Sequence, residues 1–386
     1  MRIFVIHNFY QHAGGEDVVF RQEVDALSKE HEVAVFTIQN KKGIKGMLQY
    51  MSYPFNKRMS RQITETIVQF RPEVVHIHNM HYAMGPWFIR AIVKRNIPIV
   101  CTLHNFRLLC PSASLFFKGK IFTDSLHEDF PWKAIRLRVL DHSFVKTFVT
   151  GFTYWLHRKL GTWQAVARYI VLSDFARTLF QQSTFPVHRD KFVVRPNALS
   201  VIEHPQERSQ RFLYIGRLAE EKGILPLLAA FADLPFHLDI YGTGPQRRQV
   251  EAMVHKHPNL HYHGFQPQDV LAEAICQTTA LIVPSVCFEG MPMTIIEAFA
   301  QGTPVLASNI GILAEMVLPL STGMRFDPFS GEDIRKTIVA WAHLDAAKKK
   351  EIAMQCQLSY RRQYTLTANM DRLLTIYQQV IAEQRA

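Results

Sequence analysis

The sequence predicts an α/β protein built from two doubly wound, Rossmann-like domains. Three observations support this: the length of 386 residues, short apolar runs that alternate with longer helical stretches, and a second series of such runs after residue 200. Domains commonly hold about 150 residues, so two are expected. Short apolar runs alternating with helices are typical of parallel sheets covered by helices on both faces.

The apolar runs give the order of the expected strands. In the first half they are residues 2–8, 32–39, 74–79, 97–105, 169–173 and 191–195. In the second half they are residues 212–217, 237–242, 260–264, 280–285 and 304–308, after which the chain is expected to remain helical. Residues 195–211 are polar and contain prolines, so they are the expected linker. We therefore expect domains over 1–200 and 201–365 facing each other across a cleft, and a helix over 366–386 that returns to the first domain.

Composition limits the class of protein. The five cysteines are scattered and form no CxxC pair, which argues against a disulfide framework or a thiolate zinc site. The N-terminal residues MRIFVIHN are too short an apolar stretch for a signal peptide, and no apolar run approaches the ~20 residues that span a bilayer. These features predict a cytoplasmic protein.

Charge is distributed unevenly between the two halves. Residues 1–200 carry 27 Lys and Arg against 14 Asp and Glu, whereas residues 201–386 carry 17 against 19. The first half is therefore expected to have an anionic partner that the second half does not share. Anionic lipid, nucleic acid and a phosphorylated substrate all fit this asymmetry.

Polar residues gather at the expected carboxyl ends of the first-domain strands. Three strands are expected to end in His-Asn pairs, the last of them His104-Asn105, and His104 is the candidate for sugar binding or charge stabilisation. His76, His78 and His81 raise a zinc hypothesis, but no carboxylate completes a ligand set, so no metal is expected. Gly14 and Gly15 lie between the first strand and a helix, where backbone amides can approach an anion.

The second domain carries a set of charged residues after two strands. Arg217 and Lys222 can clamp a diphosphate, but on this stretch alone solvated pairing with Glu220 and Glu221 is the favoured interpretation. Glu289 lies in a strand-end loop and Glu297 in the following helix, with residues 290–294 at the helix N-terminus. This placement suits two carboxylates that bind a ligand better than two that act as a general acid and base, which is the rival interpretation.

Residues 284–308, together with 214–223, 241–245 and 104–105, resemble the retaining family 4 glycosyltransferases of GT-B fold. Glu289 and Glu297 match the E-x7-E motif of that family. The segments HNFYQHAGGEDVVF and TLHNFRLLCP are similar to those of bacterial members that build surface polysaccharide or lipopolysaccharide.

The resemblance implies roles for the matching positions. Arg217 and Lys222 would bind the diphosphate of a nucleotide sugar, UDP- or GDP-linked, and Gly14 and Gly15 would approach it from the first domain. Glu297 would hold the ribose, Glu289 and His104 the sugar. Further donor contacts are implied for Met291, Pro292, Met293, Gly242 and Phe265. Many members have His-Asp where this chain has His104-Asn105, which puts a proton-handling role at position 105 in doubt.

The implied reaction is a hexosyltransferase-type transfer with retention at the anomeric carbon. Cations and helix amides would neutralise the departing diphosphate, and no cofactor is expected. The chain has no Asp-x-Asp, so a metal-independent reaction is expected. The acceptor would be a glycan, and a lipid-linked saccharide is expected. The alternatives are a sugar-nucleotide epimerase of the same fold, a basic nucleic-acid-binding protein, and an inactive subunit that binds a sugar nucleotide. The E-x7-E motif argues against nucleic-acid binding.

Two basic, aromatic segments predict a membrane-facing surface on the first domain. Residues 131–163 hold six Lys and Arg against one Asp, and Leu140, Phe144, Phe148, Phe152 and Leu156 recur every four residues. Residues 41–61 add a second basic stretch. The apolar stripe is either ordinary core or a helix lying in the bilayer interface. The membrane interpretation places the protein peripherally on the inner face of the cytoplasmic membrane, bound to anionic lipid.

Overall fold

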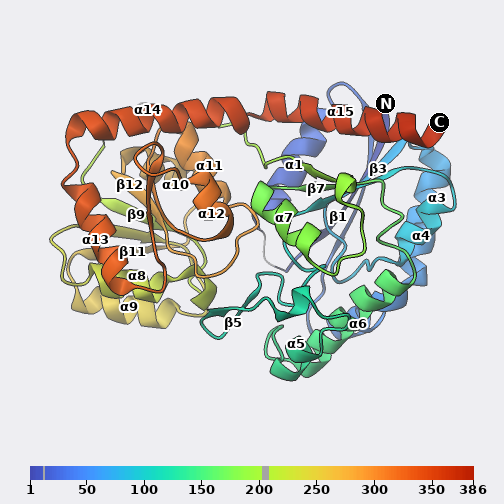
Figure 1. The fold of residues 1–386 in the computed structure, drawn as a ribbon, viewed down its shortest axis with the longest axis horizontal. Coiled ribbons are helices and arrows are strands. Elements are labelled where there is room, and N and C mark those ends of the chain that lie inside the picture. The colour runs from blue at the N-terminus through green and yellow to red at the C-terminus, as the bar shows by residue number, and fades with distance from the viewer. Residues whose placement is uncertain (12–13, 202–207) are drawn as a thin grey trace. The chain divides into compact units, whose positions relative to one another are not determined.

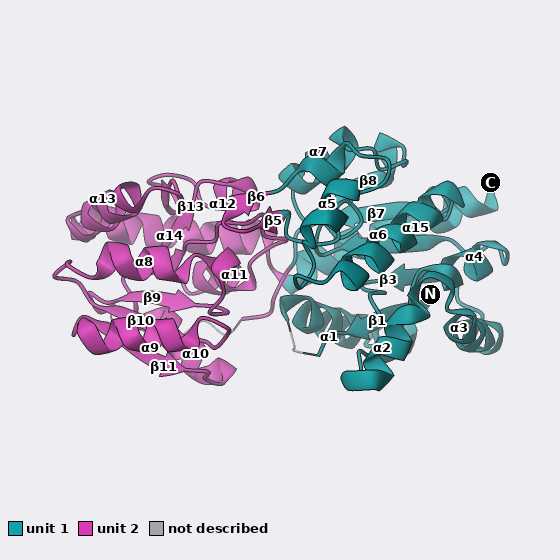
Figure 2. Cartoon of the chain, turned by 90° about the horizontal axis from the view of Figure 1, so that it is seen from below, with its two compact units in different colours: residues 1–115, 122–197, 366–386 teal, residues 116–121, 198–365 magenta. Residues whose placement is uncertain are grey.

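The structure is a computed structural model that describes residues 1–11, 14–201 and 208–386, and it divides into two compact units (Figures 1 and 2). Unit 1 comprises residues 1–115, 122–197 and 366–386, and unit 2 comprises residues 116–121 and 198–365. Residues 202–207 of the expected linker lie outside the described residues. The prediction of two doubly wound α/β domains is confirmed.

Unit 1 is built on a six-stranded parallel sheet in the order β2-β1-β3-β4-β7-β8. Its strands are β1 (Arg2–Phe9), β2 (Glu32–Gln39), β3 (Val74–Ile77), β4 (Ile99–Leu103), β7 (Arg168–Val171) and β8 (Phe192–Val194). Its helices are α1 (Gly15–Leu27), α2 (Gly43–Met51), α3 (Lys57–Phe70), α4 (Trp87–Val93), α5 (Trp132–Leu137), α6 (Phe144–Lys159), α7 (Asp174–Gln182) and α15 (Leu366–Arg385). All residues of β3 and β4 are buried, as expected of strands with both faces covered.

Unit 2 is built on a second parallel sheet, in the order β11-β10-β9-β12-β13-β14. Its strands are β9 (Phe212–Ile215), β10 (Leu238–Tyr241), β11 (Leu260–Gly264), β12 (Ala280–Val283), β13 (Val305–Ser308) and β14 (Gly323–Phe326). Its helices are α8 (Ile224–Phe231), α9 (Arg247–Lys256), α10 (Gln268–Gln277), α11 (Met293–Ala300), α12 (Gly311–Met316), α13 (Gly331–Ala342) and α14 (Ala346–Gln363). A short hairpin, β5 (Phe116–Phe117) and β6 (Lys120–Ile121), completes it.

The two strand orders place a topological switch point in each unit. In unit 1 the order reverses between β1 and β3, and in unit 2 between β9 and β12. Doubly wound sheets bind ligands in the crevice outside the carboxyl ends of the strands at such a point. The loops after β1 and β3, and those after β9 and β12, are therefore where each unit is expected to bind a ligand.

The last helix belongs to the first unit. Apolar residues of α15, including Leu373, Tyr377 and Val380, pack with Ile3 and Val100 of the sheet strands. This core places the C-terminal 21 residues, 366–386, with residues 1–115 and 122–197. Figure 1 shows α15, in red, beside the strands and α1 of unit 1.

Two expectations about the elements were wrong, and one element was missed. The chain does not stay helical after β13, because β14 pairs parallel with it. β14 has the sequence Gly-Met-Arg-Phe, which is too polar to read as an apolar run, and a Cβ at Gly323 would lie 1.7 Å from the carbonyl oxygen of Val305. The first strand does not end at its His-Asn pair but runs on to Phe9, and His7 and Asn8 are fully buried inside it. The hairpin over residues 116–121 was not predicted.

Candidate active site

The charged residues predicted in the second domain lie on both sides of the unit 2 switch point. Arg217 and Lys222 follow β9, whereas Glu289 follows β12. A hydrogen bond from the amide of Val286 to the carbonyl oxygen of Glu221, at 3.0 Å, ties the two loops together. The fold therefore brings residues that are 67 positions apart into one site.

Lys222 and Glu289 form an ion pair in this site. The Lys222 ammonium lies 2.6 and 2.8 Å from the two carboxylate oxygens of Glu289, and the Ser285 hydroxyl donates to the same carboxylate at 2.5 Å. Burial lowers the pKa of Lys222, but the Glu289 charge more than offsets this effect and the net direction is upward. An ammonium has three donors, so this geometry leaves a third for another anion.

Arg217 is placed differently. Its side chain is exposed, and its guanidinium reaches the Glu221 carboxylate only at 3.8 Å. The interpretation that the cations are solvated and paired with nearby glutamates therefore fits Arg217, whose partner is Glu221. It does not fit Lys222, whose partner is Glu289. An exposed fork-shaped cation beside an enclosed ammonium can still close on a diphosphate.

Two glycines let the unit 2 loops pack closely. Gly223 has φ +68°, and a Cβ there would lie 1.9 Å from the carbonyl oxygen of Pro284 at the end of β12. Gly242 has φ +130°, and its Cβ would lie 1.9 Å from the carbonyl oxygen of Gly216. The Gly242 amide donates to Gly264 and its carbonyl accepts from Tyr262, so this backbone is already hydrogen-bonded within the protein.

The second glutamate of the E-x7-E motif lies within α11. Glu297 is half-buried, and Gln268 donates to its carboxylate at 2.8 Å. Burial raises the pKa of Glu297, and the Gln268 hydrogen bond only partly opposes this. The N-terminus of α11 has Pro292 as its N-cap residue and Met293 as its first helical residue, and no side chain caps it. Met291 directly precedes Pro292. Phe265, at the end of β11, has a largely exposed ring.

In unit 1, His104 lies directly after β4, at the carboxyl edge of the sheet. Its Nε2 is 3.1 Å from Nδ1 of His78, which follows β3. Asn105 accepts a hydrogen bond from the amide of Arg107 and so closes a local turn. Gly14 is the N-cap residue of α1, and a Cβ there would meet nothing within 4 Å, so packing does not require a glycine. Gly15, the first residue of α1, is exposed.

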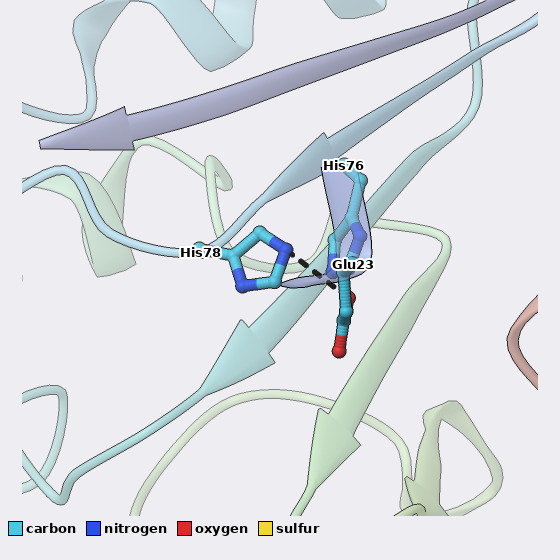
Figure 3. Close-up of side chains that lie close together, drawn as sticks. All are labelled: Glu23, His76 and His78. Carbon is cyan, nitrogen blue, oxygen red and sulfur yellow. Dashed lines mark ion pairs between the residues drawn. The ribbon is translucent and has the colours of Figure 1, made fainter. Parts of the chain in front are cut away.

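A buried cluster adjoins His104. Three buried side chains each place a nitrogen or oxygen atom within 4.8 Å of those of the other two (Figure 3). They are Glu23 of α1, His76 of β3 and His78, which follows β3. The sequence interpretation rejected a metal because no carboxylate completed the set, and that reason was wrong because α1 supplies Glu23.

These three groups nevertheless have protein partners. The Arg195 guanidinium lies 2.8 Å from Glu23, and the two ring nitrogens of His76 are bonded to the hydroxyls of Thr102 and Tyr377 at 2.8 and 2.6 Å. Burial holds the pKa of His76 well below its usual value. A buried guanidinium beside the carboxylate disfavours a cation, and the hydrogen bonds of Glu23 and His76 go to residues outside the cluster.

Sequence reasoning missed several residues of both sites. Ser285 and Gln268 bond to the two motif glutamates, and Glu23 and Arg195 support the histidines. Ser285 could have been found, because it lies two residues after the end of β12, in the loop that leads to Glu289. Glu23 and Arg195 could not, because they are 172 residues apart and only the fold joins them.

Comparison with known proteins places this two-sheet arrangement in the GT-B class. A family model described as Glycosyltransferase Family 4 matches residues 13–201, and one described as Glycosyl transferases group 1 matches residues 198–357. Together they account for both units, and the chain belongs to the family 4 glycosyltransferases.

Curated relatives match only part of the chain. A 2-deoxystreptamine glucosyltransferase of Streptomyces kanamyceticus is 30% identical over 142 residues, 35% of this chain and 36% of that protein. A lipopolysaccharide 1,6-galactosyltransferase of Salmonella typhimurium is 31% identical over 146 residues, 35% of this chain and 40% of the relative. The chain thus spans well under half the length of these relatives.

Solved structures match nearly the whole chain and show the fold. A sucrose-phosphate synthase from Thermosynechococcus elongatus has a TM-score of 0.75 at 17% identity, covering 99% of both chains. A lipopolysaccharide outer core galactosyltransferase, WaaB, has a TM-score of 0.64 at 17% identity, with 98% of this chain and 100% of that one covered. Anabaena HepE in complex with UDP has a TM-score of 0.68 at 14% identity, with 98% of this chain and 100% of that one covered.

Proposed function

We propose that this protein is a retaining, hexosyltransferase-type glycosyltransferase that moves a sugar from a nucleotide-diphosphate sugar to a hydroxyl of a glycan acceptor. The observation that carries the proposal is the convergence of Arg217, Lys222 and Glu289 at the unit 2 switch point, beside the uncapped N-terminus of α11. Cations and helix amides are the groups that stabilise a departing diphosphate.

In the proposed reaction, unit 2 binds the donor. Lys222, held by Glu289, offers its remaining donor to a phosphate oxygen, and Arg217 closes from the solvent side. The C–O bond to the diphosphate breaks as its charge is neutralised, and the acceptor hydroxyl attacks the anomeric carbon from the same face. The acceptor proton leaves with the diphosphate product or with water, and no protein nucleophile is required.

The test is a thermal stabilisation screen of the pure protein against UDP-, GDP-, dTDP- and ADP-sugars. A ligand present at ~100 times its dissociation constant should add ~2.7 kcal/mol of stability. A protein that none of these sugars stabilises would contradict the proposal. Release of nucleotide only in the presence of an acceptor distinguishes a transferase from the epimerase alternative.

Replacing the two motif glutamates is expected to impair different steps, nucleotide binding for Glu297 and sugar transfer for Glu289. Glu297→Ala should weaken the binding of free UDP or GDP, because Glu297 is proposed to hold the ribose diol. Glu289→Gln should leave nucleotide affinity nearly unchanged, because the amide oxygen can still accept from Lys222. It should lose transfer, because Glu289 is proposed to hold the donor sugar. Calorimetric titration with the free nucleotide measures the difference, and equal weakening in both variants would refute the assignment.

The reaction is expected to be independent of a divalent metal. The unit 2 site supplies its positive charge from Arg217, Lys222 and the α11 amides, which is the work that Mg²⁺ performs in other diphosphate sites. Turnover measured in excess EDTA should match that in its absence. Complete loss in EDTA, restored by Mg²⁺ or Mn²⁺, is the result that would overturn this expectation.

We further propose that the acceptor is lipid-linked and that unit 1 docks on the anionic inner face of the cytoplasmic membrane, in surface polysaccharide or lipopolysaccharide synthesis. The support lies on α2, where Ile44, Met47, Leu48 and Met51 recur at helical spacing and are 57–74% exposed. Lys41, Lys42 and Lys45 flank this apolar face, and residues 41–61 contain no acidic residue. Such a face suits the interface of an anionic bilayer.

The aromatic stripe of residues 131–163 is neither simple core nor one continuous helix. Leu140 precedes α6, Phe144 is exposed, and Phe148, Phe152 and Leu156 are half-buried. The rings of Phe144, Phe148 and Phe152 stack in a file at about 6 Å spacing. The buried residues of α6 are instead Thr147, Val149, Thr150, Gly151, Thr153, Tyr154 and His157. In the described part of the chain, no helix combines the length and apolar character needed to cross a bilayer.

Membrane docking predicts salt-sensitive sedimentation with anionic but not neutral liposomes. Reversing Lys57, Arg58, Arg136 and Arg138 to Glu should abolish it, since all four side chains are exposed. Leu48→Asp should also weaken it, whereas the matched control Met354→Asp, on α14 of unit 2, should not. Donor binding should persist in every variant. Indifference of the wild-type protein to lipid charge would refute docking.

A further inference from the structure

Arg107 of unit 1 is a half-buried cation that lies in the loop after β4. Its Nη1 donates to the carbonyl oxygen of Pro111 at 2.9 Å, whereas its Nε is shielded from solvent and has no hydrogen-bond partner. Within the described residues its guanidinium forms no ion pair. Arg208, a half-buried arginine of unit 2, instead donates to three carbonyl oxygens and to the Thr303 hydroxyl. Buried polar groups normally have partners, so the bare Nε of Arg107 indicates a partner from outside the fold.

The groups around Arg107 do not neutralise its charge at pH 7. The titratable groups that face it are chiefly four tyrosine hydroxyls, and burial raises the pKa of each, so they are uncharged: Tyr10, Tyr53, Tyr82 and Tyr154. Burial and the charge of Asp17 raise the pKa of Glu16 to about 8, and the Arg107 charge opposes this rise only in part. Glu16 is therefore largely protonated. The Tyr82 ring, 6.0 Å from the guanidinium, can offset only part of the charge.

Arg107 borders a pocket at the carboxyl edge of the unit 1 sheet. Residues that follow β1, β3 and β4 line it, among them Tyr10, Asn79, His81, His104 and Arg107. The pocket therefore lies at the switch point between β1 and β3. His81 is only 2% exposed and its Nε2 also has no hydrogen-bond partner. Burial and the Arg107 charge hold the pKa of His81 well below its usual value, so this ring is neutral.

The described residues that line this pocket include no carboxylate. Arg107 also borders a second pocket, which contains Glu128, but the two side chains form no ion pair. The first pocket thus combines a permanent cation with neutral polar groups. A negatively charged ligand would supply the charge that the protein does not.

We propose that Arg107 binds an oxyanion of the acceptor, a phosphate or a carboxylate, in the pocket at the unit 1 switch point. That the ligand is the acceptor rests on the proposed function, in which unit 2 binds the donor. Nε and Nη2 of a guanidinium direct their N–H groups along one edge, which matches two oxygens of a carboxylate or phosphate. In Arg107 the hydrogen bond to Pro111 uses Nη1 and leaves this edge without a protein partner. Because Nε is shielded in the free protein, the guanidinium must turn slightly toward the pocket when the oxyanion binds.

The negative charge of the acceptor can lie in one of two places. A phosphate ester or a uronate places the charge on the sugar, whereas a lipid diphosphate places it in the link between sugar and lipid. The chemistry toward Arg107 is the same in both cases. Probes of the two kinds therefore distinguish the sources.

Calorimetric titration of the full chain, with an excess of free UDP or GDP to fill the unit 2 site, measures the proposed contact. Glucuronate and glucose 6-phosphate carry the charge on the sugar, farnesyl-diphosphate-linked glucose carries it in the link, and glucose is the neutral probe. At least one anionic probe should bind about ten- to a hundredfold more tightly than glucose, as expected for hydrogen bonds to a charged group. A wild-type protein that binds no anionic probe more tightly than glucose would overturn the inference.

Variants of Arg107 test whether this residue is the cation responsible. Arg107→Gln should abolish the preference for the anionic probe, and Arg107→Lys should retain part of it, because the charge remains and the fork is lost. The matched control is Arg158→Gln, since Arg158 is a half-buried arginine of α6 that lines the second pocket and already pairs with Asp129. That variant should keep the wild-type preference. An undiminished preference in Arg107→Gln, or its loss in Arg158→Gln, would contradict the assignment.

The stability of Arg107→Gln separates ligand binding from a structural role. Its urea midpoint should stay close to that of the wild type, because the glutamine amide can still donate to Pro111 and no carboxylate is left unpaired. Arg195→Met, which breaks a buried ion pair, should lower the midpoint clearly. A loss in Arg107→Gln as large as that in Arg195→Met would show that the protein itself supplies the partner of Arg107, and would overturn the inference.

The same measurements separate this inference from the proposed function. A wild-type protein that binds no sugar nucleotide would refute the proposed function, while the comparison of anionic probes with glucose would still decide the Arg107 site. A protein that transfers sugar equally well to neutral and anionic acceptors, with and without Arg107, would retain the proposed function and refute the oxyanion site.

Discussion

Replacing Lys222 by alanine is expected to lower turnover by about 10²–10³, because it removes a charge that stabilises the departing diphosphate. Arg217→Ala is expected to lower turnover by a similar factor for the same reason. Steady-state kinetics with the donor found by the stabilisation screen measures both. Near-normal turnover in both single variants would remove the diphosphate clamp from the proposed mechanism.

The two variants should differ in stability, which makes each the control for the other. Lys222→Ala leaves the Glu289 carboxylate, only 12% exposed, without its partner, whereas Arg217 is 63% exposed and its partner is 3.8 Å away. Unfolding in urea should therefore show a clear loss for Lys222→Ala and almost none for Arg217→Ala. Adding Glu289→Gln to Lys222→Ala should recover part of the loss, because no unpaired carboxylate remains.

The largest effect on stability is expected at Arg195. Arg195→Met leaves Glu23 charged and unpaired in the interior of unit 1, which should cost about 3–5 kcal/mol in the free energy of unfolding. The matched control is Arg168→Met, since Arg168 pairs with the exposed Glu383 and should cost less than about 1 kcal/mol. Urea unfolding at pH 7 measures both, and equal costs would contradict the buried pair.

The contribution of Glu23 to stability should depend on pH with opposite signs in the wild type and in Arg195→Met. In the wild type the pKa of Glu23 is depressed, so its contribution is present above the unfolded value of about 4.3 and is lost only as the pH falls toward the folded value. In Arg195→Met the unpaired carboxyl should have a raised pKa, so its penalty should shrink as the pH falls from 7 toward 5. A mutational cost that does not change over this interval would show that Glu23 is not the group responsible.

The sequence predicted the parts of the fold that have a local pattern. Apolar strands such as β4 and β12 could be recognised because both faces are buried and the run is continuous. β14 could not, because its identity as a strand depends on pairing with β13 and on the space left at Gly323. His7 lies inside β1 for a similar reason, since β2 extends the pairing as far as Phe9.

The candidate sites were predictable as sets of residues but not as sets of contacts. Arg217, Lys222, Glu289 and Glu297 were found because each follows or joins a strand end in a recognised motif. Their pairing was not, since Glu220 and Glu221 are nearer to Lys222 in the chain than Glu289 is. The partners of the histidines come from α1 and from residue 195, and no local pattern marks a residue as the partner of a group that far away.

The position of α15 has a consequence for how the protein is made. The ribosome delivers residues 1–197 first, and then the whole of residues 198–365, before the helix that completes the core of unit 1 emerges. At typical rates of synthesis this interval lasts roughly 10–30 s. Throughout it, His76 lacks the Tyr377 hydroxyl, Arg195 lacks the Asn369 carbonyl, and the apolar surface that receives Leu373 and Val380 stays open to water. The first unit to be synthesised is therefore the last to be finished, and a nascent chain stalled before residue 366 should bind chaperones through that uncovered surface.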